Sequence, residues 1–338
     1  DLIDAHRRGE IPDPDALAPD VFGFATPGRI FHTRTNIKVQ DGCDNFCTFC
    51  IIPFVRGRAT SRNPDDVVRE AHEAITGGSH ELVLTGVNMS RYQFDGGVDF
   101  VALVERILSL PGDFRVRISS LEPDHLTDRF ITLFQHPRMA PHLHLCAQSG
   151  SDRVLLQMRR MYTAEEFCRV VHSLRAVDPQ FNVTTDIIVG FPGETDADVA
   201  ATLALVSDLQ IGHVHTFPYS LRHGTRAERM DDRIPGPVIA ERARTIRDLS
   251  DVQKRRYRES LIGTRERVLV ERIEQPSVGS SGGEALARGL GNHYVPIRIP
   301  VDPTAPHHVR PNTFHTVEIV GIADETDPDL IGQLPQSS

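Results

Sequence analysis

Three cysteines within eight residues constrain this chain more than any other feature of its sequence. Cys43, Cys47 and Cys50 have the spacing C-x3-C-x2-C within QDGCDNFCTFCIIPFVRGR, the segment from Gln40 to Arg58. A predicted strand, Asn36 to Gln40, comes directly before them, so the thiols fall in the loop after a strand. Thiolates are soft ligands that favour zinc, Cu(I) or iron–sulfur clusters. The loop is therefore predicted to hold a metal centre.

The number of ligands favours a cluster over zinc. A structural zinc ion closes its site with four protein ligands, and the sequence has no second C-x-x-C or H-x3-H pair to supply the fourth. The other cysteines, Cys146 and Cys168, lie far away and are interpreted as packing residues. Three thiolates fit a cubane [4Fe-4S] cluster that keeps one iron open to another molecule. A zinc knuckle and ordinary buried thiols are the alternatives on spacing alone.

Motifs after the cysteine loop carry a resemblance to a known family. The loop's position after a first strand, with Phe49 before the last cysteine, resembles the radical S-adenosylmethionine (SAM) superfamily. The whole set is similar to the methylthiotransferases, most of all to the branch that acts on threonylcarbamoyladenosine in tRNA. Between about residues 30 and 325 the motifs are DGCDNFCTFCIIPFVRGRATSR, LTGVN (84–88), ISSLEP (118–123), QSGS (148–151), MYT (161–163), DIIVGFPGET (186–195) and FPYSLRHGT (217–225).

Strands and helices alternate along most of the chain, which predicts an α/β fold with a parallel sheet and helices outside it. Asn63, Pro64 and two following acids are a helix start, and Gly77–Gly78 ends that helix. Six strands, and not eight, agree with the partial open (β/α)6 barrel that the resemblance implies. The predicted strands are 36–40, 81–85, 115–119, 142–146, 182–189 and 213–217. The predicted helices are 64–76, 98–109, 124–135, 151–159, 164–176, 196–209 and 237–261.

The organisation of the rest of the chain follows from local composition. Residues 1–29 are interpreted as a linker or remnant of an N-terminal domain, 30–260 as the radical SAM domain, and 326–338 as a disordered acidic tail. Residues 261–325 contain short alternating strands, at 265–273, 285–290, 293–299 and 314–320, with a Gly/Ser-rich turn at 278–283. They predict a small all-β barrel, which resembles an RNA-binding TRAM domain. The family also carries three N-terminal cysteines for a second [4Fe-4S] cluster, expected only in the full-length protein.

The resemblance implies the cofactors and their ligands. Cys43, Cys47 and Cys50 would hold the cluster, whose open iron chelates SAM so that one electron breaks an S–C bond and gives a 5′-deoxyadenosyl radical. No acid or base is assigned, because the cofactors carry the chemistry. The predicted SAM-binding residues follow the strand ends and are Gly86, Asn88, Ser120, Glu122, Gln148, Gly190 and Tyr219.

Several of these residues have a second interpretation. Asn88 is either a ligand or a turn residue, and Glu122 either accepts hydrogen bonds from SAM or caps the next helix. The turn from Gly190 to Thr195 is equally a good helix entry. Arg56 and Arg58 either reach a phosphate or carboxylate or are solvated surface side chains.

Other features are interpreted more simply. Phe46 and Phe49 either shield the cluster or are ordinary core aromatics. The His142/His144 and His213/His215 pairs each project onto one face of a strand, and satisfied core histidines are the favoured interpretation over a metal site.

Charge and composition bear on the partners. The net charge is −9, but residues 221–300 carry 16 Arg or Lys against 11 Asp or Glu, which supports contact with phosphate. The sequence contains no apolar run of 18 residues, so no membrane span is predicted. The few cysteines indicate a reducing compartment. We expect a cytoplasmic monomer that binds the tRNA anticodon region and takes electrons from a flavodoxin or ferredoxin.

The predicted activity is that of a radical SAM tRNA methylthiotransferase, which adds a methylthio group to C2 of the threonylcarbamoyl-modified adenosine beside the anticodon. As given, the chain is expected to cleave SAM without completing the transfer. The isopentenyl-adenosine and ribosomal-protein branches are alternatives, although the former usually reads TSHP where this chain has ISSLEP. A zinc-containing RNA-binding module is the alternative that is not an enzyme.

Overall fold

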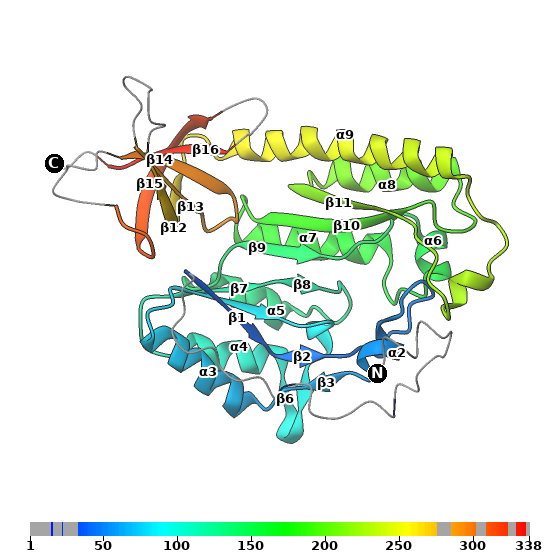
Figure 1. Ribbon diagram of the computed structural model, residues 1–338, viewed down its shortest axis with the longest axis horizontal. Helices are drawn as coiled ribbons and strands as arrows, with labels where there is room; N and C mark the ends of the chain where they lie inside the picture. Colours follow the sequence, from blue (N-terminus) through cyan, green and yellow to red (C-terminus); the bar gives the residue numbers. More distant parts are fainter. Residues whose placement is uncertain are drawn as a thin grey trace.

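Two β-structures, an open α/β barrel and a small closed barrel, make up the part of the chain that the computed structural model describes, which is residues 15, 22, 33–275, 285–301, 309–323 and 329–335 (Figure 1). The expected linker at 1–29 lies almost wholly outside the described residues. None of the described helices is long and apolar enough to cross a membrane.

Parallel strands in sequential order form the open barrel. Its strands are β1 (Arg34–Lys38), β4 (Glu81–Thr85), β7 (Arg115–Ile118), β8 (Ser120–Leu121), β9 (His142–Leu145), β10 (Asn182–Val189) and β11 (His213–Pro218). They form two sheets, β1-β4-β7 and β8-β9-β10-β11, in which every neighbouring pair is parallel. All six predicted strands are present, and the third is divided at Ser119 into β7 and β8. An open (β/α)6 arrangement results, so the predicted α/β class is confirmed.

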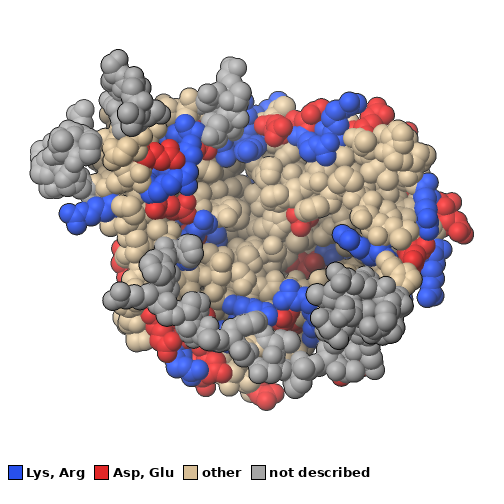
Figure 2. Space-filling model, viewed as in Figure 1, with Lys and Arg blue, Asp and Glu red and all other residues tan. Residues whose placement is uncertain are grey.

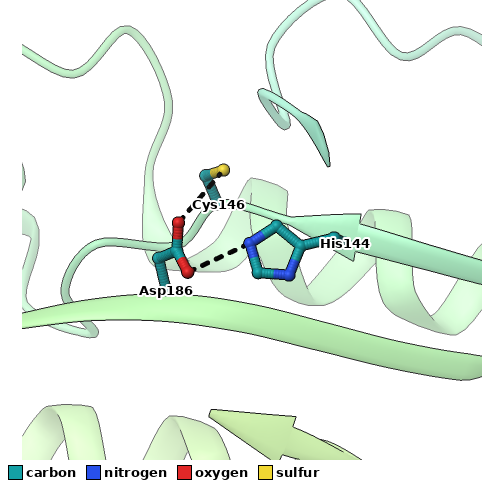
Figure 3. Close-up of side chains that lie close together, drawn as sticks. All are labelled: His144, Cys146 and Asp186. Atoms are coloured by element: carbon teal, nitrogen blue, oxygen red, sulfur yellow. Dashed lines mark hydrogen bonds and ion pairs between the residues drawn. The ribbon is translucent and has the colours of Figure 1, made fainter. Parts of the chain in front are cut away.

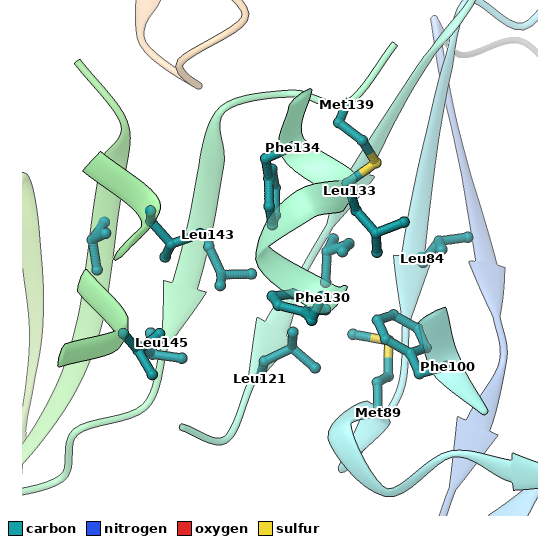
Figure 4. Packing of buried hydrophobic residues seen from close by; sticks show 14 of the residues in the cluster. Leu84, Met89, Phe100, Leu121, Phe130, Leu133, Phe134, Met139, Leu143 and Leu145 are labelled. Atoms are coloured by element: carbon teal, nitrogen blue, oxygen red, sulfur yellow. The ribbon is translucent and has the colours of Figure 1, made fainter. Parts of the chain in front are cut away.

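Apart from α2 (Ile52–Arg56), which lies in the cysteine loop, the helices pack on the outer side of these sheets (Figure 1). The others are α3 (Pro64–Thr76), α4 (Phe100–Leu108), α5 (Asp128–Thr132), α6 (Asp152–Gln157), α7 (Ala164–Val177), α8 (Asp196–Asp208) and α9 (Gly236–Ser260). Short two-stranded ribbons, β2 (Gln40–Asp41) with β3 (Thr60–Ser61) and β5 (Gln93–Phe94) with β6 (Val98–Asp99), lie in the connections. Alternate strand residues such as Leu84 and Leu143 pack with Phe100, Phe130 and Phe134 in one continuous core (Figure 4).

The opposite strand residues face the barrel interior and are mostly polar. In β10, for example, Val183 and Ile187 are buried in the core, whereas Asp186 lies on the other face. A sheet whose inner face carries charged side chains is suited to a polar ligand, because an interior that only needed packing would be apolar.

The small barrel is closed by five strands. They are β12 (Arg265–Glu274), β13 (Ala285–Leu290), β14 (Pro296–Val301), β15 (Phe314–Ile322) and β16 (Leu330–Gln333), in the order β12-β13-β14-β16-β15. Leu330 is fully buried in its core with Val268 and Ile297. The prediction of a disordered tail from residue 326 is therefore wrong for 330–333, which form a strand between β14 and β15. The Gly/Ser-rich turn at 278–283 lies outside the described residues.

One predicted helix start is also wrong. The helix expected from Asp124 begins at Asp128, where the Thr127 side chain accepts a hydrogen bond from the Phe130 N–H. His125 has a φ of 67°, which an α-helix does not allow, and Asp124 pairs with Arg91 at 2.8 Å instead. The predicted start at Asn63 with Pro64 is confirmed, because the Asn63 side chain accepts from the Asp65 N–H.

Buried charges join the two barrels. Glu81 is fully buried and pairs with Arg115 and, at 2.9 Å, with Arg117. The guanidinium groups also donate to main-chain oxygens of the small barrel, such as the Leu290 carbonyl (3.0 Å) and the Asn292 carbonyl (3.1 Å). The tip of the small barrel is thus held against the amino-terminal ends of the open barrel's strands.

A buried histidine forms a second charged contact at the same junction. His293 contacts Glu266 of the small barrel through Nδ1 and Asp178 of the open barrel through Nε2 at 3.2 Å. Burial alone would lower the pKa of His293, but its hydrogen bonds to Asp178 and Glu266 outweigh burial and raise the pKa to about 9. The imidazolium therefore bridges two carboxylates.

Alkaline pH is expected to weaken this junction. Because the folded-state pKa of His293 is raised, its stabilisation is complete below the unfolded pKa of about 6.5 and is lost as the pH rises through about 9. The shift corresponds to roughly 3 kcal/mol. Urea unfolding from pH 6 to pH 10 should show this loss. His293→Gln should flatten the pH dependence in this range, and an unchanged slope would contradict the assignment.

Candidate active site

The cysteine loop leaves the carboxyl end of the first strand and is fixed at both ends. β2 pairs with β3 across the loop, and the Cys43 N–H donates to the Gly57 carbonyl at 3.2 Å. Gly42 has a φ of 67°, and a Cβ there would collide with the Arg58 carbonyl oxygen, so glycine is required. The loop therefore holds its thiols in a defined place at the carboxyl edge of the barrel.

Arg56 and Arg58, the two arginines considered for ligand contact, form ion pairs with acidic side chains of the same segment. Arg56 pairs with the buried Asp41 at 2.7 Å, and Lys38 pairs with the same carboxylate. Arg58 lies 3.2 Å from Asp44. In this structure both arginines brace the loop.

The three thiols lie close together and receive hydrogen bonds. The Arg160 guanidinium donates to the Cys47 sulfur at 3.2 Å, and the Asn88 side-chain amide lies 3.8 Å from the Cys43 sulfur. Burial raises the pKa of Cys50 to about 11, with the neighbouring Cys47 and Cys43 thiols adding to the effect. Adjacent thiolates without a cation repel one another, so the trio requires a positively charged centre to stay ionised.

The spacing of the sulfur atoms fits a cluster better than one zinc ion. Two sulfurs bound to one zinc are at most about 4.6 Å apart, given Zn–S bonds of about 2.3 Å. Within the described residues, the three loop sulfurs do not all lie within 4.8 Å of one another. In a cubane cluster each thiolate binds a different iron, which allows a wider spacing. The residues present therefore fit a [4Fe-4S] cluster.

A buried arginine network lies beside the thiols and was not predicted. Arg160 is only 8% exposed and pairs with Glu122, while its Nε donates to the Tyr162 hydroxyl at 3.0 Å. Tyr162 in turn donates to the Cys146 carbonyl at 2.6 Å. Glu122 does not cap the following helix, whose cap is Thr127, so that interpretation of Glu122 is wrong. Tyr162 belongs to the MYT motif noted in the sequence, but nothing in the sequence indicated that Arg160, just before that motif, is buried.

The loop after β4 contains two of the predicted SAM contacts. The Gln40 side chain accepts from the Val87 and Asn88 N–H groups at 2.9 and 2.7 Å and so fixes this turn against β2. A Cβ at Gly86 would crowd Met89 and Gln40. Asn88 is buried, and its Oδ1 accepts from the Ser90 hydroxyl. Asn88 thus faces the cysteine loop with its amide directed at sulfur.

The other predicted contacts lie at strand ends on the same edge. Ser120 is paired with His144 in register, and Gln148, with a φ of 63°, joins β10 through the Asp186 carbonyl. The Tyr219 N–H donates to the Val189 carbonyl, and the Tyr219 hydroxyl is buried without a partner among the described residues. The structure thus brings the predicted residues to one edge, and their contact with SAM stays a prediction.

Gly190 has a structural reason to be glycine. Its φ is 77°, and a Cβ there would collide with Ile239 of α9, while its N–H donates to Glu194 at 2.8 Å. Thr195 is the N-cap of α8, as the alternative interpretation of this turn predicted.

A cluster of His144, Cys146 and Asp186 lies on the inner face of β9 and β10 (Figure 3). His144 Nε2 is 3.1 Å from Asp186, and its Nδ1 is 2.9 Å from the Thr184 hydroxyl. The Cys146 thiol lies 3.9 Å from Asp186, and burial raises its pKa. Both ring nitrogens of His144 therefore have partners, as the core-histidine interpretation predicted, whereas the buried Nδ1 of His142 has no partner among the described residues.

An open α/β barrel with a three-cysteine loop after its first strand is the architecture expected of a radical SAM protein. The profile of the Radical SAM superfamily matches residues 37–206, half of the chain. The threonylcarbamoyladenosine tRNA methylthiotransferase MtaB of Thermotoga maritima is 39% identical over 87% of this chain and 64% of its own length. MtaB of Chlamydia pneumoniae is 36% identical over 89% of this chain and 68% of its own. This chain belongs to the methylthiotransferase family of the radical SAM superfamily.

Other relatives have a different substrate in their names. The tRNA-2-methylthio-N(6)-dimethylallyladenosine synthase of Ralstonia nicotianae is 36% identical over 80% of this chain and 61% of its own length. The chain spans 64% and 55% of the MtaB proteins of Thermotoga maritima and Treponema pallidum. Among solved structures, coproporphyrinogen III oxidase (HemN) of Escherichia coli has a TM-score of 0.48 and 18% identity, covering 64% of this chain and 52% of that one. Family membership implies a [4Fe-4S] cluster and SAM as cofactors.

Proposed function

We propose that this chain carries the catalytic centre of a radical SAM tRNA methylthiotransferase, which acts on C2 of the threonylcarbamoyl-modified adenosine beside the anticodon. The observation that carries the proposal is the fixed loop of three thiols at the carboxyl edge of an open barrel with a polar interior. The relatives named for threonylcarbamoyladenosine reach 40% identity, and those named for dimethylallyladenosine reach 36%, which favours the first substrate over the second.

The residues of the chain position the cofactors and exclude water. Cys43, Cys47 and Cys50 would hold the cluster, which with SAM supplies the electron, the radical cleavage and the methyl group. Asn88 and Arg160 donate to cysteine sulfurs, and such hydrogen bonds tune an iron–sulfur centre. Glycine at position 86 lets the turn after β4 pack closely against Met89 and Gln40, next to the cysteine loop. The chain's contribution is thus placement and electrostatics, while the cofactors supply the reactive atoms.

The small barrel and the arginine-rich helix before it supply the proposed RNA contact. α9 carries seven Arg or Lys residues over Gly236–Ser260, and the small barrel follows it directly. In the view of Figure 2, Lys and Arg side chains lie around the rim of the molecule, with Asp and Glu among them. We propose that the small barrel is a TRAM-like module, that the partner is the tRNA anticodon region, and that a flavodoxin or ferredoxin supplies electrons to a cytoplasmic monomer.

Anaerobic reconstitution followed by a SAM-cleavage assay tests the proposal. The chain should bind about four irons with equal sulfide, absorb in the visible range and release 5′-deoxyadenosine when SAM and a reductant are added. A zinc-binding RNA module would be colourless and would leave SAM intact. Colourless protein containing zinc after reconstitution would contradict the proposed function.

The substrate is tested by tRNA from a strain that lacks the gene. Mass spectra should show that the methylthio group is lost from threonylcarbamoyladenosine and kept on isopentenyl-adenosine. Loss from the isopentenyl nucleoside alone would assign the chain to the other branch.

A further inference from the structure

A pocket of about 620 Å³ lies where the inner face of the open barrel meets the small barrel. We call it the junction pocket; its polar lining includes Arg34, Asn36, Arg117, Glu271, Arg272 and Tyr294. The first two come from β1 and Arg117 from β7, on the side of each strand opposite the apolar core. Glu271 and Arg272 come from β12, so both barrels build the pocket.

The lining carries three guanidinium groups against one carboxylate. Within the described part of the chain, Arg34 forms an ion pair with Glu271 at 2.9 Å and Arg272 forms one with Glu274 at 2.9 Å. A guanidinium has five N–H donors, so these two side chains retain donors for an anion. Arg117 is different, because Glu81 and main-chain carbonyls engage it on several sides. The anion-binding capacity of the pocket therefore rests on Arg34 and Arg272.

An aromatic ring completes the pocket. Tyr294 is 41% exposed, and its ring lies 4.7 Å from the Arg117 guanidinium and 4.6 Å from the His142 ring. Contacts on both sides hold the ring in place. A fixed aromatic ring beside arginines suits a planar, anionic ligand, because the ring packs on its plane and the arginines bind its charge.

The position of the pocket relates it to the cysteine loop. Arg34 and Gln40 are six residues apart along an extended segment, about 20 Å, and the cysteines follow Gln40. The interior of the open barrel lies between the two, so a nucleoside bound in that interior, with C2 on the side of the cysteine loop, would direct its N6 substituent toward the junction pocket. A threonylcarbamoyl group ends in a carboxylate, whereas a dimethylallyl group is apolar.

We propose that the junction pocket binds the carboxylate of the threonylcarbamoyl substituent, with Arg34 and Arg272 as its ligands and Tyr294 packed beside it. This inference rests on the proposed function and names the residues that set its substrate specificity. Beyond their ion pairs with Glu271 and Glu274, Arg34 and Arg272 retain N–H donors that a carboxylate accepts from and an apolar substituent cannot. The pocket thus selects a charged N6 substituent over an apolar one.

Two matched RNAs test the proposal. One anticodon stem-loop carries threonylcarbamoyladenosine, and the other carries its methyl ester, which has the same shape without the charge. Fluorescence anisotropy with the anaerobically reconstituted full chain should give a Kd about tenfold lower for the acid. The Arg34→Gln/Arg272→Gln double variant should bring the ratio of the two Kd values close to one. Arg69→Gln, on the exposed face of α3, is the control that should keep the ratio.

The outcomes separate this inference from the function on which it rests. Iron content and the thermal unfolding midpoint show that each variant is folded. A parent chain that cleaves SAM and binds both RNAs equally overturns the inference alone, as does a double variant that keeps the preference. A parent chain that binds neither RNA overturns both the inference and the tRNA assignment.

Discussion

Cys47→Ala is expected to lower the iron content of the reconstituted chain from about four atoms to less than one, and to bring SAM cleavage to background. Cys47 is the buried member of the trio and accepts a hydrogen bond from Arg160 at 3.2 Å. Its removal leaves two thiolates, which cannot occupy three corners of a cluster. Iron and sulfide analysis, visible absorption and release of 5′-deoxyadenosine measure the result.

The chain supplies a matched control for this experiment. Cys168→Ser removes a thiol on α7, away from the loop, and should leave the iron content unchanged. If Cys47→Ala kept its iron and its colour, the loop could not be the cluster site, and the proposed chemistry would lose its basis.

Glu81→Gln is expected to cost about 3–5 kcal/mol of unfolding free energy. The carboxylate is fully buried between Arg115 and Arg117, which keep the pKa of Glu81 near 2 against the opposing effect of burial. The substitution preserves shape but leaves two buried guanidinium groups without their counterion. Urea unfolding at pH 7 measures the loss.

An exposed ion pair gives the comparison. Asp66→Asn removes the partner of Arg69 on the surface of α3 and should change the stability by less than about 0.5 kcal/mol. If the two substitutions lowered the unfolding free energy equally, burial would not be the reason that the Glu81 ion pairs stabilise the fold. Acid should destabilise the chain in the same way as Glu81→Gln. Because the pKa of Glu81 is lowered, the stabilisation that its carboxylate provides is lost as the pH falls through about 2.

The parts of the fold that could be predicted are those with local causes. Glu81–Thr85 is a short apolar run between turn residues, and Asn63–Pro64 is a capped helix start, so each signal lies within its own segment. Leu330–Gln333 lacks such a signal: it is four residues long and becomes a strand only by pairing with β14 and β15. The start at Asp124 was wrong because Thr127, three residues later, also caps a helix and is the cap that forms.

The candidate site divides in the same way. Cysteine spacing is a property of the sequence, so the loop of Cys43, Cys47 and Cys50 could be found without a structure. Arg160 could not, because an arginine is usually exposed and only the folded chain brings it to Cys47 across 113 residues. Gly190 was predicted to be glycine because the backbone approaches a ligand there. The fold also requires glycine at this position, because a Cβ would collide with the Ile239 side chain.

The contacts between the two barrels have a consequence for sequence change. Arg115 and Arg117 donate mainly to main-chain oxygens of Arg267, Leu290, Gly291 and Asn292, which every amino acid presents. The acceptors at Arg267 and Leu290 would therefore survive a change of side chain, whereas a Cβ at Gly291 would collide with Glu266 and the Asn292 side chain itself accepts from Arg115 at 3.0 Å. A one-residue insertion or deletion in the β13–β14 turn would displace all of the carbonyls in that turn together, so the turn is constrained in its length as well as at Gly291 and Asn292.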